Sequence, residues 1–243
     1  MHWIDDDRQA YAVAMKRRRL FGLAAVALTP AARAESDLPQ PLALNLVTSD
    51  RGSWNGAECL AVELTDPEQK LRLETTGGGN RPSFAIVHRD FTDGVLEVAI
   101  AGTLTGKGAP DDRGFVGLSF HITPDFMSHE TVYLRMTNGR LNVPPPPEPR
   151  FSRAIQYVAD PGFHFSDSRE QFPGRYEKGA DIAVGRWCRL RLEIAGPRLR
   201  ASVDGTEVLA VEDLRFAGRR GPVGLFVGDG SRGYFRELRV RPA

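Results

Sequence analysis

The sequence is poor in cysteine, in unbalanced charge and in long apolar runs. Its 243 residues contain two Cys, and 32 Lys and Arg stand against 31 Asp and Glu. Two cysteines exclude a disulfide scaffold, and no C-x-x-C pair or H-E-x-x-H stretch gives the spacing of a zinc site. The balanced charge lacks the basic excess that a nucleic-acid partner requires. No apolar run reaches the roughly 18 residues of a membrane helix, so a globular chain with 41% hydrophobic residues remains.

The N-terminal segment has the three parts of a secretory signal peptide. Four cations at 16–19 precede an apolar run at 20–28, and a small-x-small sequence follows at 32–34. The last two of these cations, an arginine pair, together with Phe21 also match part of the twin-arginine export pattern.

These features divide the chain into two parts. We predict an N-terminal extension and helical signal peptide at 1–34, with Met15 as an alternative start and cleavage after Ala34. Residues 35–243 would form a single exported domain, delivered to the bacterial periplasm or secreted by the Sec or the twin-arginine route. A chain of this length can bury roughly 70% of its unfolded surface, so it needs no cross-links.

Residues 35–243 show the two-residue periodicity of β-strands. In two runs the apolar side chains form one face and polar side chains the other, which predicts strands with one buried face. The apolar set is Val116, Leu118 and Phe120, with Val132, Leu134 and Met136. Similar alternation occurs at 188–194, 199–203, 223–227 and 234–240. Outside the signal peptide no segment reads as helix, so we predict an all-β sandwich or jelly roll.

Turn and loop signals separate these runs. Asp204-Gly205 is a strong hairpin signal, and Gly228-Asp229-Gly230 repeats the arrangement between the last two strands. The prolines at 144–147 exclude helix and central strand, which predicts a stiff extended loop. Residues 77–80 lack the Gly-Lys-Ser/Thr of a phosphate loop and read as a flexible connection.

The order of the motifs resembles a known superfamily. The segments are FTDGVLEVAI (91–100), GFVGLSFHI (114–122), YLRMTNGR (133–140), AIQYVADPGF (154–163), REQFPGRYEKGADIAVGRWCRLRLEI (169–194), LRASVDGTEVL (199–209) and GPVGLFVGDGSRGYFRELRV (221–240). Together they resemble the concanavalin A-like lectin/glucanase superfamily, particularly laminin-G-like domains and the neighbouring 3-keto-disaccharide hydrolase group. The resemblance implies a concanavalin A-like jelly-roll sandwich of two antiparallel sheets. Lectins, adhesion modules and glycosidases share this fold, so the resemblance does not decide the chemistry.

A carbohydrate ligand fits the polar face of the two patterned strands. Sugars offer apolar C–H faces and hydroxyl groups, so their sites combine aromatic rings with planar polar groups. An alternative is that these side chains are ordinary solvated or mutually paired groups. The long segment at 163–176 would supply further contacts, although its three Phe residues would equally cap a small satellite core. The predicted ligand contacts are Ser119, His121, Tyr133, Arg135, Asn138, Tyr157, Arg169 and Tyr176.

An enzyme related to the 3-keto-disaccharide hydrolases is the alternative function, and a laminin-G-type protein-interaction module is the third. No Glu-x-Asp-x-x-Glu motif provides the carboxylate pair of a retaining glycosidase. A base for other sugar chemistry would come from His121, Glu130, His164 or Glu170. The catalytic residues stay unassigned, and the sequence identifies no cofactor, metal ligand or Ca²⁺ site.

The two cysteines differ in the face that they occupy. Cys188 alternates with the apolar side of its strand, whereas Cys59 lies on the side opposite to Leu60, Val62 and Leu64. A disulfide would stabilise by at most about 5 kcal/mol, but the pattern favours two free thiols.

Overall fold

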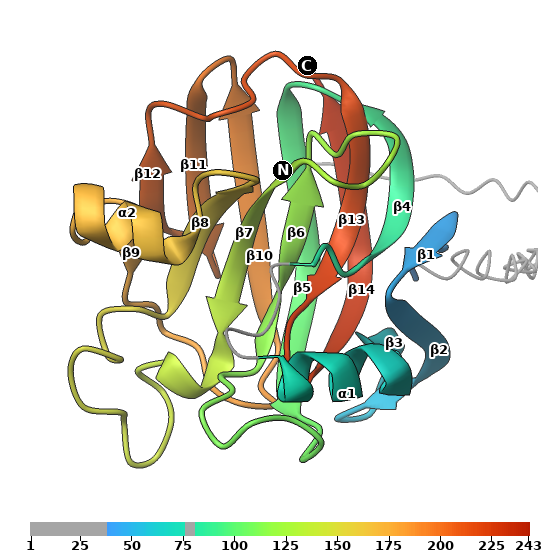
Figure 1. Cartoon of the computed structure of the whole chain (residues 1–243), viewed down its shortest axis with the longest axis vertical. Helices are drawn as coiled ribbons and strands as arrows, with labels where there is room; N and C mark the ends of the chain where they lie inside the picture. Colours follow the sequence, from blue (N-terminus) through green and yellow to red (C-terminus); the bar gives the residue numbers. More distant parts are fainter. Residues whose placement is uncertain (1–37, 76–80) are drawn as a thin grey trace, which may run out of the picture. The chain divides into compact units, whose positions relative to one another are not determined.

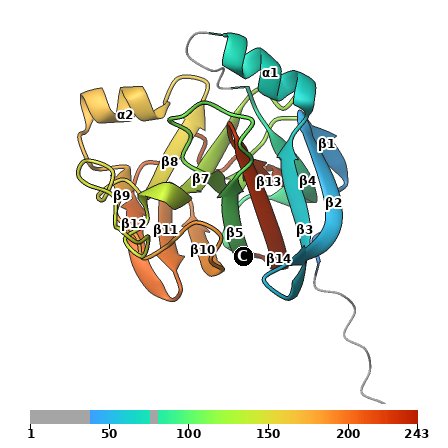
Figure 2. The ribbon, with the colours of Figure 1, turned by 90° about the horizontal axis from the view of Figure 1, so that it is seen from below.

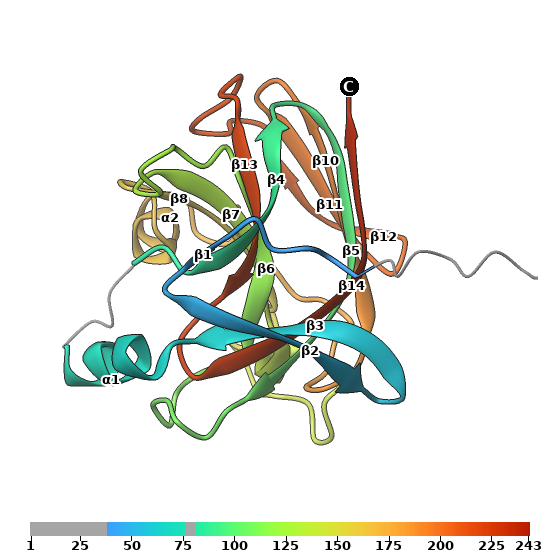
Figure 3. The ribbon, with the colours of Figure 1, turned by 90° about the vertical axis from the view of Figure 1, so that its right-hand side faces the viewer.

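Two antiparallel sheets, stacked face to face, make up the computed structural model, which describes residues 38–75 and 81–243 (Figure 1). Sheet A contains, in spatial order, β1 (Ala43–Asn45), β4 (Phe84–Phe91), β13 (Gly221–Val227), β6 (Phe115–Phe120), β7 (His129–Arg135), β8 (Ile155–Asp160) and β9 (Glu177–Lys178). Sheet B contains β12 (Thr206–Val211), β11 (Arg198–Val203), β10 (Cys188–Ala195), β5 (Gly94–Leu104), β14 (Ser231–Pro242), β3 (Ala57–Leu64) and β2 (Val47–Trp54). Figures 2 and 3 show these sheets as two layers. The predicted jelly-roll sandwich of two antiparallel sheets is confirmed.

The core lies between the two sheets and contains the apolar faces predicted from the alternation. On β6 and β7, Val116, Leu118 and Phe120 are fully buried together with Val132 and Leu134. Burial of one such side chain stabilises by ~1.5–3 kcal/mol, so these strands hold sheet A against sheet B. The described residues form one compact unit. The predicted signal peptide at 1–34 lies outside the described residues.

The two predicted turns have different outcomes. Asp204 and Gly205 join β11 to β12 with φ of 48° and 84°, as the hairpin signal requires. The expected hairpin at 228–230 is wrong, because β13 belongs to sheet A and β14 to sheet B. This turn carries the chain from one sheet to the other. Asp229 lies in the turn, just after the end of β13.

Helix α1 (Asp66–Glu74) corrects the expectation that only the signal region is helical. Thr65 caps its N-terminus, since the hydroxyl accepts a hydrogen bond from the Glu68 backbone N–H at 3.3 Å. The side chains that α1 buries are Glu68, Gln69 and Arg72. Because this buried face is polar, the sequence has no apolar stripe that would predict the helix. Within the described residues, no helix combines the length and apolar character needed to cross a membrane.

The segment 163–176, expected to be an unpatterned loop, contains helix α2 (Phe165–Gln171). The His164 backbone N–H donates to the Asp167 carboxylate at 2.7 Å and closes the first turn. Phe163 joins the main core between the sheets and Phe172 packs against it, so these two rings do not form the separate satellite core of the alternative, and Phe165 is not part of the core. Figure 2 shows α1 and α2 on the same side of the sandwich, next to strands of sheet A.

Strand ends and loops account for the remaining differences. β6 stops at Phe120 because His121 has a φ of 52°, and β7 gives way to the 3₁₀ turn η1 (Met136–Asn138). The proline-rich stretch at 144–147 forms neither helix nor strand, as predicted. The glycine-rich connection at 77–80 lies outside the described residues.

Candidate functional site

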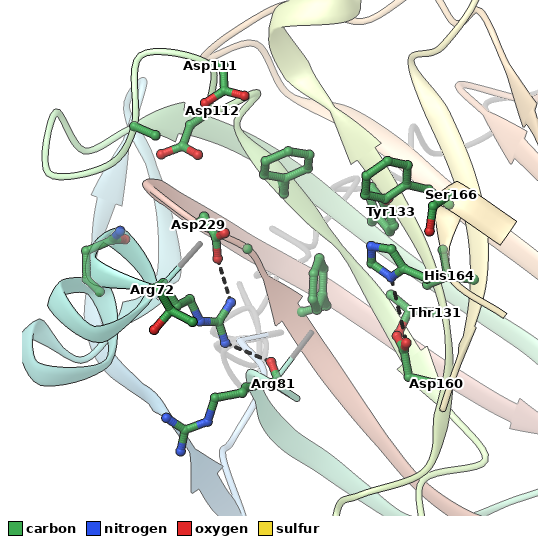
Figure 4. A pocket seen from close by; sticks show the side chains of 18 of the residues that line it. Arg72, Arg81, Asp111, Asp112, Thr131, Tyr133, Asp160, His164, Ser166 and Asp229 are labelled. Carbon is green, nitrogen blue, oxygen red and sulfur yellow. Dashed lines mark hydrogen bonds and ion pairs between the residues drawn. The ribbon is translucent and has the colours of Figure 1, made fainter. Parts of the chain in front are cut away.

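A pocket of about 630 Å³ lies on the outer face of sheet A, between α1 and α2 (Figure 4). Its floor comes from the central strands of this sheet, and its walls come from α1, from the turn before β6 and from the start of α2. Figure 4 shows Arg72, Arg81 and Asp229 on one side, with Asp160 and His164 on the other. This volume lies within the range of about 300–1,000 Å³ that is typical of small-molecule sites.

Three aromatic rings in mutual contact form what we call the aromatic floor: Phe115 on β6, Tyr133 on β7 and Phe226 on β13. The ring centroid of Tyr133 lies 5.9 Å from that of Phe115 and 5.5 Å from that of Phe226. Gly117 pairs with both Tyr133 and Phe226 and lies between them in the sheet. A Cβ at Gly117 would lie 2.2 Å from the Val132 carbonyl oxygen, so only glycine allows β6 to approach β7 this closely.

The first wall is built on Arg72 of α1, whose guanidinium is held on three sides. It donates to the Glu68 carboxylate at 2.8 Å, to Asp229 at 2.6 Å and to the Arg81 carbonyl oxygen at 2.7 Å. Arg81 also pairs with Glu68 at 2.8 Å and keeps 46% of its side chain exposed. The wall is therefore fixed by charge-assisted hydrogen bonds, and Arg81 retains donors that face solvent.

The opposite wall is a carboxylate between two imidazoles. Asp160, at the end of β8, lies 3.9 Å from His129 Nε2 and 3.7 Å from His164 Nδ1. Both distances exceed a hydrogen bond, so the carboxylate keeps acceptor capacity. Burial lowers the pKa of His129, against the opposing effect of Asp160 and Glu130, and this favours its neutral form.

Asp112, in the turn between β5 and β6, forms the upper wall in Figure 4. A Cβ added to Gly108 or Gly230 would lie 1.7 Å or 2.0 Å from its Oδ2 atom, so the carboxylate is packed against two glycine backbones. Burial, with the nearby Asp229 charge, raises the pKa of Asp112 to about 6. This carboxyl group is therefore destabilised in its charged form.

Several buried polar atoms around the pocket lack a hydrogen-bond partner within residues 38–75 and 81–243. They are Gln69 Nε2, Asp112 Oδ2, His129 Nδ1 and His164 Nδ1, and all four residues line the pocket. Buried polar atoms in proteins are almost always hydrogen-bonded. All four atoms are buried within the walls, so the polar groups open to a ligand are the half-exposed Arg81 guanidinium and the Asp160 carboxylate.

Of the eight residues predicted as ligand contacts, Tyr133 lines this pocket. Arg135 lies next to it but is buried under α2, where it donates to the Tyr133 hydroxyl at 3.0 Å and pairs with Glu177 at 3.5 Å. Arg169 donates to the same Glu177 carboxylate at 2.7 Å. Arg135 and Arg169 therefore fix α2 to the edge of sheet A and lie outside the pocket lining.

Two further predicted contacts are satisfied inside the protein. Ser119 shares a hydrogen bond with Thr131 at 2.7 Å. His121 bonds Glu130 at 2.5 Å and the Thr92 carbonyl oxygen at 2.8 Å. Both side chains are fully buried, so their expected surface position is corrected. Strand alternation identified them as polar positions, but the loop after β6 covers this part of the sheet.

The last three predicted contacts also lie away from the pocket. Tyr157 is in the core, because Gln156 and not Tyr157 pairs with Tyr133 and shares its face. Tyr176 is 1% exposed and donates to Asp213, which with burial raises its pKa to about 12. Asn138 is buried in η1 and donates to the Arg153 carbonyl oxygen at 2.8 Å.

The residues predicted as possible bases are likewise divided between the pocket, the surface and the core. His164 lines the pocket, Glu170 is exposed on α2, and the His121–Glu130 pair is sealed in the core with the Tyr157 hydroxyl. Within the described ranges, no group of three or more His, Cys, Asp or Glu side chains is arranged to hold a metal ion. Cys59 and Cys188 are both free and buried, in separate clusters, as their alternation predicted.

Sequence reasoning missed Arg72, Asp112, Asp160 and Asp229. One signal was available for α1: Thr65 is followed three positions later by Glu68, with Pro67 in the first turn, a pattern typical of a helix start. That helix places Arg72 on the pocket. Asp112 and Asp229 lie in two turns that come together because the chain changes sheets after β13. No local sequence pattern predicts this change of sheet.

Comparisons with known proteins give similarities of fold. No family model matches the chain, and no curated protein matches it. The carbohydrate-binding module CBM66 of Bacillus subtilis is 13% identical with a TM-score of 0.48, over 80% of this chain and 94% of that one. Galectin LEC-6 of Caenorhabditis elegans is 10% identical with a TM-score of 0.39, over 67% and 93%. An alginate lyase of Corynebacterium sp. is 11% identical with a TM-score of 0.37, over 79% and 75%. At these values the function has to be inferred from the pocket itself.

Proposed function

We propose that this chain binds carbohydrate in the pocket on the outer face of sheet A. One observation carries the proposal: an apolar floor of three contacting rings lies between the half-exposed guanidinium of Arg81 and the Asp160 carboxylate, which is beyond hydrogen-bond distance of both flanking imidazoles. A sugar ring presents apolar C–H groups on its faces and hydroxyl groups around its edge. The aromatic floor suits the face, and the walls suit the edge.

Each wall offers a defined kind of hydrogen bond. The half-exposed guanidinium of Arg81 supplies donors, and the Asp160 carboxylate supplies acceptors on the other side. Vicinal hydroxyl groups both donate and accept, so one sugar can use both walls.

The charge of the pocket favours a neutral sugar. Four Asp side chains line it, at 111, 112, 160 and 229, against the two arginines Arg72 and Arg81. Both arginines are also paired with the Glu68 carboxylate. A sulfated or uronic-acid unit would therefore meet a net negative lining, which disfavours it through like-charge repulsion.

A glycan array with the full chain tests the proposal. We expect signals on neutral oligosaccharides and weaker signals on sulfated or uronate-containing ones. Phe226→Ala removes one ring of the aromatic floor and is expected to weaken binding about tenfold or more, because a stacked aromatic contact is lost. Phe151→Ala is the matched control, since this ring lies against Arg140 outside the pocket. A blank array, or equal binding by both variants, would overturn the proposal.

The same glycans distinguish binding from cleavage. The array-positive oligosaccharide is incubated with the protein, and its reducing ends and chain lengths are measured. Unchanged chains are the outcome expected for a binding domain, and shortened chains would replace it with a sugar-cleaving enzyme. If the array is blank and a pull-down retains a protein partner, the interaction-module alternative replaces both.

Export is part of the proposal, because a polysaccharide ligand is met outside the cytoplasm. The signal-like segment at 1–34 supports it. Fractionation of a bacterium that expresses the full chain, followed by N-terminal sequencing, is expected to find a form that begins after Ala34 outside the cytoplasm. An uncleaved cytoplasmic chain would contradict this part of the proposal.

A further inference from the structure

A second hollow of about 470 Å³ continues from the pocket along the outer face of sheet A. The two share three lining residues: Arg81, Asp160 and His164. These residues form a waist, with Arg81 on one side and the Asp160–His164 pair on the other in Figure 4. Shared walls mean that the two hollows are successive parts of one cleft.

The far end of the second hollow is apolar and is presented by a tight turn. Phe126 and Met127 line it, and Met127 is 63% exposed. The turn is fixed by Asp125, whose carboxylate accepts from the Thr123 hydroxyl at 2.6 Å and from the Met127 backbone N–H at 3.0 Å. Phe126 meets Phe84 edge to face with their ring centroids 5.8 Å apart. The second hollow therefore also has a fixed apolar surface.

The waist has free capacity for a ligand that crosses it. The Asp160 carboxylate lies beyond hydrogen-bond distance from both imidazoles that flank it, at 3.7 and 3.9 Å. Arg81 keeps nearly half of its side chain in solvent. A hydroxyl placed between them would reach a donor on one side and an acceptor on the other.

We infer that the cleft takes a chain of sugars rather than a single one, with one part over the aromatic floor and the next against Phe126 and Met127. The waist would hold the sugar that joins the two parts. This inference rests on the proposed function, because it gives the length of the ligand that the pocket would bind. The occupant of the second hollow is the continuation of the same oligosaccharide.

Ladders of neutral oligosaccharides test the inference. Cello-, laminari- and chito-oligosaccharides of one to six sugars are titrated into the full chain by isothermal titration calorimetry. For the series that binds, affinity is expected to rise with length beyond the sugars that cover the aromatic floor, by about tenfold in total for the second hollow, and then to level off. Met127→Ala removes an exposed side chain. It is expected to abolish much of this gain in affinity and to leave the affinity for the shortest binding oligomer unchanged. Phe126→Ala is expected to do the same more strongly.

The outcomes separate the inference from the proposed function. If short and long oligomers bind equally, and neither variant changes the affinity for long ones, the second hollow is no subsite, while the pocket still binds sugar. If no oligosaccharide of any series binds, both the proposed function and this inference are refuted. Because Phe126 contacts Phe84, the thermal midpoint of each variant is measured, and Met127→Ala decides the matter should Phe126→Ala fail to fold.

Discussion

Replacing the buried carboxylate of Asp112 by an amide is expected to stabilise the protein at neutral pH. The folded state raises the pKa of Asp112 from an ordinary value of 3.8 to about 6, mainly through burial. A group with a raised pKa holds its proton more tightly in the folded state than in the unfolded one. Stability therefore falls as the pH rises from about 4 to 6, and the loss is complete above the folded pKa.

The expected size of this loss follows from the difference between the two pKa values. Each pH unit between them corresponds to about 1.4 kcal/mol, so the ionised Asp112 costs about 3 kcal/mol above pH 7. Asp112→Asn cannot ionise and avoids this cost. The two proteins should have similar stability near pH 4, and the advantage of the variant should grow up to about pH 6 and stay constant above it.

Urea unfolding of both proteins at pH 4, 5, 6, 7 and 8 measures this gap directly. Asp111→Asn is the matched control, because it removes a carboxylate from the neighbouring exposed position of the same turn. A gap that stays the same at all pH values would refute the reasoning, and so would a wild type that gains on the variant as the pH rises. The first result would mean that folding leaves the pKa of Asp112 unchanged, and the second that a favourable partner stabilises its carboxylate in the folded state.

Three further predictions concern the structure around the site. Arg135→Met leaves the Tyr133 hydroxyl and the Gln156 amide oxygen without their donor, while Glu177 keeps Arg153 and Arg169, and it should lower the free energy of unfolding by about 1–3 kcal/mol in urea at pH 7; an unchanged midpoint would contradict this expectation. Gly117→Ala forces a Cβ against the Val132 carbonyl oxygen and should cost about 1–3 kcal/mol in the same assay, whereas Gly52→Ala on β2, with open space around it and no left-handed backbone, lacks this clash. A non-reducing thiol titration should find both Cys59 and Cys188 reactive only after denaturation, and the absence of thiols would reveal a disulfide.

The fold could be predicted well because its core is built from regular alternation. Val116, Leu118 and Phe120 occupy every second position of β6, and each faces sheet B. The same alternation could not place the ligand contacts. It separates core-facing from outward-facing side chains, but it does not say whether an outward side chain is then covered. Arg135 faces outward and is buried by α2, and Ser119 by the loop after β6.

The pocket walls depend on contacts between distant segments. Arg72 of α1 meets Asp229 across 157 positions of the chain, and Gln69 accepts from the Gly230 backbone N–H at 2.8 Å. A helix whose buried face is polar, and a turn that changes sheets, leave no periodic signal. Tyr133 could be predicted because it lies on a regular strand and faces outward, and although it is largely buried it lines the pocket.

The proposed sugar binding depends most directly on the aromatic floor. The decisive measurement is calorimetric titration of the tightest neutral oligosaccharide into the wild type and into the Phe115→Ala/Phe226→Ala double variant, with Phe151→Ala as control. We predict one site per chain in the wild type and in the control, and no measurable binding in a double variant that still unfolds cooperatively. Binding of undiminished strength by a folded double variant would contradict the account and place the sugar elsewhere.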